Sequence, residues 1–178
     1  MLNNKTGRSL LKTVGLPTPI DLKRYRADQE TYFEGKVLVG ASENAALLND
    51  LMRNLAAAKA TVCFPANAHT AAAIVAAANN AGVKAVGVEC SKNMTDKFDA
   101  FVFDASGFQE ASDLDQLYTF FNPVMRKLGR NGRVITLGRP HLKAKTGEQA
   151  AAMRALEGFS RSVAKEIGKK SATSQAVY

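Results

Sequence analysis

The sequence is poor in the side chains that build metal sites and disulfide frameworks. Two cysteines, Cys63 and Cys90, lie within or beside apolar segments, so we expect both to be reduced and buried. Two histidines, His69 and His141, have no cysteine or aspartate at ligand spacing, and the sequence predicts no metal site. No run approaches the roughly 18 apolar residues of a membrane helix.

These absences favour a soluble, cytoplasmic protein. The N-terminus is basic but has no long apolar run, which argues against a secretory signal. A transit peptide stays open as a minor alternative, because Asp21 is the first acidic residue. The length of 178 residues, with 46% hydrophobic and 22% charged residues, fits one globular domain.

Positive charge is concentrated at the end of the chain. Residues 124–178 carry 12 Lys and Arg against 3 Asp and Glu, a net charge of +9, whereas residues 1–123 carry 12 against 13. A basic segment attracts anions such as nucleic acid, a cofactor phosphate or an acidic carrier protein. We expect most of these cations to cover the solvent faces of two helices. Nucleic acid binding rests on charge alone and is the least favoured hypothesis.

After residue 35, short apolar runs alternate with segments of helical period. Strands are predicted over residues 36–40, 61–64, 83–89, 98–104 and 133–137, and from residue 173 onward. Helices are predicted over residues 44–58, 68–81, 112–128 and 146–167. Capping boxes of Ser112 with Asp115 and of Thr146 with Gln149 would open the last two helices, and Pro123 would kink the third.

This alternation predicts an α/β fold with a doubly wound parallel sheet of about six strands and helices on both faces, as in Rossmann and flavodoxin-like domains. Residues 1–35 are expected to form an N-terminal arm and residues 36–178 the domain. The chain stops inside its last predicted strand without a polar tail, and we therefore expect a truncated piece of a longer two-domain protein.

Ligands of this fold bind at the carboxyl ends of the strands. The loop after the first strand retains one glycine, Gly40, and Glu43 would set a negative charge beside a phosphate. The methyl groups of Ala45 and Ala46 would crowd a close backbone approach. Ser42 either caps the next helix or contacts a phosphate, and we favour the cap.

The remaining candidate residues predict no chemistry. Cys63 lies among β-branched residues of a strand and is expected to pack rather than react. Asp99 and Asp104 flank a strand, but their spacing places them on opposite faces, so they do not form a carboxylate pair. From the residues alone we expect no catalytic, cofactor-binding or metal-binding residue.

Several segments resemble the short-chain dehydrogenase/reductase family. They are residues 37–64, residues 101–107 (FVFDASG), residues 132–140 (GRVITLGRP) and residues 155–168 (ALEGFSRSVAKEIG). The family uses a Tyr as proton donor and a Lys four residues later. The resemblance puts Gln149 at the Tyr position and Met153 at the Lys position.

The other family positions have changed as well. The catalytic serine position falls at Gly138 or Arg139, with Thr136 two residues back, and the helix asparagine falls at Gln116. None of these side chains takes over proton donation. The resemblance therefore implies a degenerate domain that keeps the scaffold and loses the chemistry.

A narrower resemblance adds residues 15–27 (GLPTPIDLKRYRA) and residues 102–134. Together with residues 154–168 they look like the N-terminal, flavodoxin-like domain of bacterial high-molecular-weight 3-oxoacyl-ACP reductases. That implies a non-catalytic segment that binds no cofactor, joined to a complete reductase domain that uses NADH or NADPH in fatty acid metabolism. Implied partners are the C-terminal reductase domain, a second copy in a homo-oligomer, and acyl carrier protein or acyl-CoA.

The alternative hypothesis is a free-standing nucleotide-binding protein. It would bind its ligand through the loop after the first strand and the basic final third of the chain. It requires binding despite the lost glycines.

Overall fold

The computed structural model describes residues 33–178 and, before them, residues 7, 9, 11, 13–15, 22–24 and 28. The predicted arm over residues 1–35 therefore lies largely outside the described residues. The strands of the described part are β1 (Lys36–Ala41), β2 (Thr61–Pro65), β3 (Ala85–Val88), β4 (Phe98–Asp104), β5 (Leu128–Leu137) and β6 (Thr173–Val177). Its helices are α2 (Leu48–Ala57), α3 (Ala71–Asn80), α4 (Asp115–Phe121) and α5 (Gly147–Ile167).

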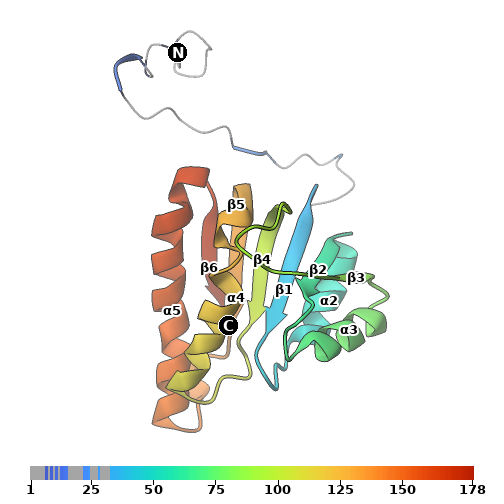
Figure 1. Ribbon diagram of the computed structural model, residues 1–178. Helices are drawn as coiled ribbons and strands as arrows, with labels where there is room; N and C mark the ends of the chain where they lie inside the picture. The colour runs from blue at the N-terminus through green and yellow to red at the C-terminus, as the bar shows by residue number, and fades with distance from the viewer. Residues whose placement is uncertain are drawn as a thin grey trace.

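The strands form one parallel sheet in the order β3-β2-β1-β4-β5-β6. The chain moves outward in one direction from β1 to β3 and in the other from β4 to β6, which is the doubly wound arrangement. The predicted fold class, with six strands and helices on both faces, is confirmed (Figure 1).

Side-chain alternation divides the core into two layers. Leu38 and Phe101 point toward α4 and α5 and belong to an aromatic-rich cluster. Val37 and Val39, their neighbours on the other face, pack with α2 and α3. Both faces of the central strands are thus buried, as expected for a parallel sheet that is covered by helices.

The third predicted helix is wrong in its extent. Instead of a kinked helix over residues 112–128, a 3₁₀ turn over Ala111–Leu114 leads into α4, which ends at Phe121. Pro123 lacks an N–H and crowds the preceding turn, so it ends the helix rather than bending it. Leu128 already belongs to β5. The capping box also lies earlier, between Glu110 and Asp113.

The final helix matches its prediction closely. The Thr146 hydroxyl accepts a hydrogen bond from the Gln149 N–H at 3.1 Å, and the helix ends at Ile167. Gly82, with φ of +68°, follows the C-terminus of α3 as predicted. Among the described residues, no helix has the length and apolarity needed to span a membrane.

Candidate functional site

The carboxyl ends of β1 and β4 lie side by side, and Ser42 joins the loops that follow them. Ala41 is in register with Asp104. The Ser42 N–H and the Ser42 hydroxyl both donate to the Asp104 carbonyl oxygen, at 2.8 and 3.0 Å. The same hydroxyl accepts from the Gly107 N–H at 3.1 Å. The expectation that Ser42 caps the next helix is wrong, because α2 begins only at Leu48 and the hydroxyl points toward the neighbouring strand.

The buried Asp104 carboxylate and the Ser106 hydroxyl accept hydrogen bonds from the N–H groups that precede α2. One oxygen accepts from the Leu47 N–H at 2.8 Å and the other from the Ser106 N–H at 2.9 Å. The Ser106 hydroxyl accepts from the Ala46 N–H at 2.7 Å. Asp104 and Ser106 are both 0% exposed. Backbone N–H groups at this place in a doubly wound fold usually bind a phosphate, and here they bind the chain's own side chains.

Two glycines of this edge make room for other parts of the same chain. A Cβ on Gly40 would overlap the Phe120 ring and lie 2.8 Å from the Phe103 ring. A Cβ on Gly107 would collide with the backbone of Glu43 and lie 2.7 Å from the Ser42 hydroxyl. The retained glycine of the first loop therefore makes room for an aromatic side chain of α4, and that packing is a structural reason for a glycine at this position.

Gln149 and Met153 lie one turn apart on the buried side of α5. The Gln149 side-chain amide donates to Gln109 Oε1 at 2.9 Å and to the Phe108 carbonyl oxygen at 3.3 Å, while its oxygen accepts from the Lys145 N–H at 2.8 Å. Met153 is 1% exposed. Both side chains join α5 to the loops after β4 and β5. An amide and a thioether do not gain or lose a proton near neutral pH, so neither side chain can act as a proton donor.

The other positions singled out by the resemblance also have structural contacts. A Cβ on Gly138 would lie 2.6 Å from a Leu156 methyl carbon. The Arg139 N–H points at Met153 Sδ, 3.4 Å away. Thr136 is buried and donates to the Gln175 carbonyl oxygen at 3.4 Å. No hydroxyl is therefore presented at the expected serine position.

A cavity of about 510 Å³ opens beside these loops, between the carboxyl ends of β1 and β2 and the helix α4. Its lining is Gly40, Ala41, Glu43, Pro65, Ala66, Asn67, Ala68, His69, Thr70, Cys90, Phe103, Asp115, Gln116, Thr119, Phe120 and Pro123. The lining has two carboxylates and no Lys or Arg, so its charge disfavours a phosphate. The structure brings His69 and Gln116 to this cavity and leaves His141 outside its lining.

Both cysteines are free thiols, and the expectation that both are buried holds for Cys63 alone. Both are free, Cys63 is buried and Cys90 is half-buried at the cavity wall. Burial disfavours the thiolate and raises the pKa of Cys90 to about 11, and it raises the pKa of Cys63 as well. The raised pKa of Cys63 is consistent with the packing role that the sequence predicts for it.

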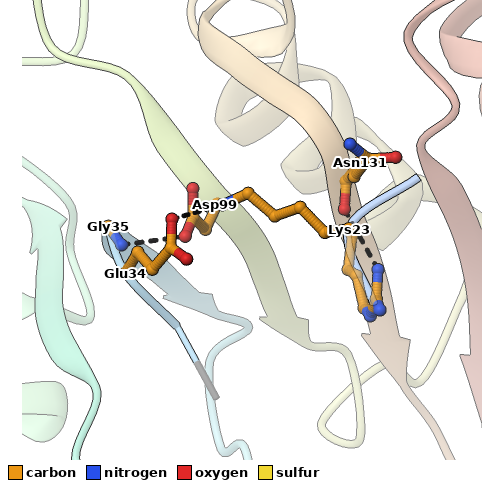
Figure 2. A network of polar contacts seen from close by, with 6 residues as sticks. Lys23, Glu34, Gly35, Asp99 and Asn131 are labelled. Atoms are coloured by element: carbon orange, nitrogen blue, oxygen red, sulfur yellow. Dashed lines mark hydrogen bonds and ion pairs between the residues drawn. The ribbon is translucent and has the colours of Figure 1, made fainter. Parts of the chain in front are cut away.

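Asp99 and Asp104 lie at opposite ends of β4, as expected of residues that form no carboxylate pair. Asp99 accepts from the Gly35 N–H at 2.8 Å, next to the ion pair of Lys23 with Glu34 (Figure 2). The hydrogen bond from Lys23 to Glu34 raises the pKa of the Lys23 ammonium. Within the described residues, no group of three His, Cys, Asp or Glu side chains is placed to hold a metal ion.

Solved structures of similar fold include dehydrogenase/reductases at low sequence identity. A dehydrogenase/reductase from Sinorhizobium meliloti is 20% identical, with 81% of this chain and 71% of that chain covered and a TM-score of 0.59. A blue fluorescent protein from a metagenomic library, solved with NADPH, is 19% identical, with 81% and 73% covered and a TM-score of 0.58.

A third structure gives the same result. The short-chain dehydrogenase/reductase from Serratia marcescens is 19% identical, with 81% of this chain and 73% of that chain covered and a TM-score of 0.55. The chain thus has the Rossmann-like α/β fold of these enzymes. No protein-family model matches the chain, and no curated protein matches it.

Proposed function

We propose that the chain is a non-catalytic, reductase-like domain of an NAD(P)H-dependent 3-oxoacyl-ACP or acyl-CoA reductase. The observation that carries the proposal is the state of the two positions where the family has its Tyr and Lys. Gln149 and Met153 are buried there, and the Gln149 amide and the Met153 sulfur bond to neighbouring loops. At the position of the proton-donating Tyr the chain thus has a residue whose side chain makes structural contacts.

The absence of a cofactor from this segment is part of the proposal. The N–H groups of Ala46 and Leu47 are occupied by Ser106 and Asp104, and the neighbouring cavity carries negative charge. A dinucleotide would have to displace a buried carboxylate before its pyrophosphate reached the start of α2. That displacement leaves a charge without its hydrogen bonds, which costs more than a surface contact returns.

The reaction then belongs to a second domain. In the proposed bacterial, cytoplasmic parent protein, a C-terminal reductase domain binds NADH or NADPH and transfers hydride to the C3 carbonyl of an acyl chain, while its Tyr supplies the proton. The described segment contributes interface area to that domain or to a second copy. Acyl carrier protein or acyl-CoA is the partner of the whole enzyme in fatty acid metabolism.

A second candidate is a free-standing nucleotide-binding protein. It is favoured by one observation, the open cavity of about 510 Å³ at the edge where doubly wound folds bind ligands. It is disfavoured by the carboxylates of Glu43 and Asp115 in the lining.

Calorimetric titration with NADH and with NADPH separates the two candidates. The chain and the longer protein that contains it are titrated side by side under identical conditions. The proposal expects saturable binding by the longer protein and none by this chain. Micromolar binding by this chain alone would overturn the proposal and favour the nucleotide-binding candidate.

A further inference from the structure

The cations of the final third do not lie where the sequence predicts. Of the 12 Lys and Arg in residues 124–178, α5 carries Arg154, Arg161 and Lys165. Arg154 and Arg161 both pair with Glu157. Most of the others lie in loops, turns and β5, so the expected coating of two helices is wrong.

Six cations gather where β4, β5 and β6 begin. Because these strands are parallel neighbours, the residues before each strand meet at one edge of the sheet. This basic edge consists of Lys97, Arg126, Lys127, Arg130, Lys169 and Lys170. It lies at the end of the sheet opposite to the chain terminus marked C in Figure 1, and thus opposite to the candidate site.

Lys170 links the turn before β6 to the start of β5. Its ammonium donates to the Leu128 and Arg126 carbonyl oxygens, at 2.7 and 3.1 Å. Partial burial and the charge of Lys97 both lower the pKa of Lys170. Lys170 thus lies beside the start of β5 and within reach of the charge of Lys97, which directly precedes β4.

A bulge in β5 carries Arg130. Phe98 pairs with Leu128 and Ala100 with Arg133, so residues 129–132 stand opposite Asp99 alone. The four residues bulge out of the strand, and Asn131 has a φ of +57°. Arg130 is exposed on the bulge.

The nearby carboxylates do not neutralise the basic edge. Asp96 pairs with Lys36, and Asp99, whose carboxylate accepts from the Gly35 N–H, offsets at most one of the six positive charges. Within the described residues none of the six cations forms an ion pair. Glu166, in the last turn of α5, lies beside Lys165 in the sequence. The basic edge thus keeps an excess of positive charge, because no carboxylate of the described residues forms an ion pair with its cations.

We propose that the basic edge is a docking surface for an acidic face of another protein. Three neighbouring strands span about 10 Å, which matches the roughly 10–12 Å width of a single α-helix with its side chains. A helix with carboxylates along one face fits both the size and the charge of the edge. Such a contact is steered by charge, so it forms quickly and weakens with salt.

A nucleic acid fits this surface less well. Single-stranded binding uses exposed aromatic side chains for stacking. Among the described residues, the exposed large aromatics are Tyr118 on α4 and Tyr178 beyond the carboxyl end of β6, and neither belongs to the basic edge. The docking surface is also independent of the proposed function, because it lies at the opposite edge from the candidate site and uses none of its residues.

The test compares two charge-reversal variants of the full chain. Arg126→Glu/Arg130→Glu alters the basic edge, and Lys143→Glu/Lys145→Glu makes the same change in net charge near the other edge. All four side chains are exposed. The probes are a fluorescent helical peptide with glutamates along one face and a DNA duplex, each titrated at low and moderate salt and followed by anisotropy.

The proposal expects the edge variant to bind the peptide about tenfold more weakly than the natural chain, while the control variant stays within about twofold. Equal weakening by both variants would overturn it, because net charge alone would then explain binding. Unchanged binding by the edge variant, or no peptide binding by any form, would overturn it too. Tighter binding to the duplex than to the peptide, with a steep salt dependence, would assign the edge to nucleic acid instead.

Discussion

The Asp104 carboxylate accepts a hydrogen bond from the Leu47 N–H at 2.8 Å and so links the end of β4 to the start of α2. In doubly wound folds an anion commonly sits at the start of the first helix, where N–H groups converge. Here the anion is a buried side chain of the same chain. The contact ties two central elements of the fold together and at the same time occupies groups that a pyrophosphate would need.

Removal of this carboxylate should destabilise the fold. Asp104→Ala leaves the N–H groups of Leu47 and Ser106 without their acceptor, and we expect the free energy of unfolding to fall by about 2–4 kcal/mol. Asp104→Asn keeps the shape and one acceptor oxygen, so its loss should be smaller. Urea denaturation followed by circular dichroism measures both. Equal stability of Asp104→Ala and the natural chain would refute the structural role of Asp104.

Gly40 and Gly158 form a matched pair for testing the packing at the end of β1. A Cβ on Gly40 would overlap the Phe120 ring, whereas a Cβ on Gly158 meets nothing within 4 Å. Gly40→Ala should therefore lower the free energy of unfolding by about 1–3 kcal/mol. Gly158→Ala, in the middle of α5, should raise it by about 0.5–1 kcal/mol. The double variant Gly40→Ala/Phe120→Leu should recover part of the loss, which a thermal melt can detect.

Met153 tests whether the Lys position has been absorbed into the core. Met153→Lys would bury an ammonium at a site that is 1% exposed, within the hydrophobic cluster under α5. We expect a loss of at least about 3 kcal/mol, while Met153→Leu should cost less than about 1.5 kcal/mol. A soluble Met153→Lys chain with an unchanged unfolding midpoint would mean that the site still accepts a catalytic-type lysine.

The rate at which the Cys90 thiol reacts should depend on pH and report its burial at the cavity wall. Because its pKa is raised to about 11, the thiolate is scarce at neutral pH, and alkylation by iodoacetamide should be slow there and accelerate toward pH 11. The raised pKa also means that the native state holds its proton more tightly than the unfolded chain. The associated stability is present below the ordinary thiol pKa and is lost as the pH rises toward 11.

Mass spectrometry identifies which cysteine reacts. Cys63 is more deeply buried and should be modified more slowly than Cys90. The urea-unfolded chain serves as the control, and both thiols should react quickly in it. Rapid alkylation of native Cys90 at pH 7 would contradict its burial at the cavity wall.

The fold followed from periodicity because each strand is a short apolar run between helical segments. The position of Thr146 also identified the start of α5, since the cap is a local interaction between residues close in sequence. Pro123 was harder to interpret, because a proline inside an apolar helical pattern either kinks or ends a helix. Here Val124 is buried and the chain turns directly toward β5.

The structure of the site was less predictable, because its contacts join residues far apart in the sequence. Asp104 and Leu47 are 57 residues apart, and only the pairing of β1 with β4 brings them together. A carboxylate at the end of an otherwise apolar strand was the available signal, and it gave no indication of its partner. The same holds for Gly40, whose contact with Phe120 depends on how α4 packs.

Side chains of the chain itself occupy the N–H groups at the edge where doubly wound folds bind dinucleotides. A titration of the isotopically labelled chain with NADPH, followed by amide NMR spectra, tests it at the residues concerned. The amide signals of Ala46, Leu47, Ser106 and Gly107 should stay unchanged up to millimolar NADPH. Saturable shifts of these signals at micromolar NADPH would contradict it.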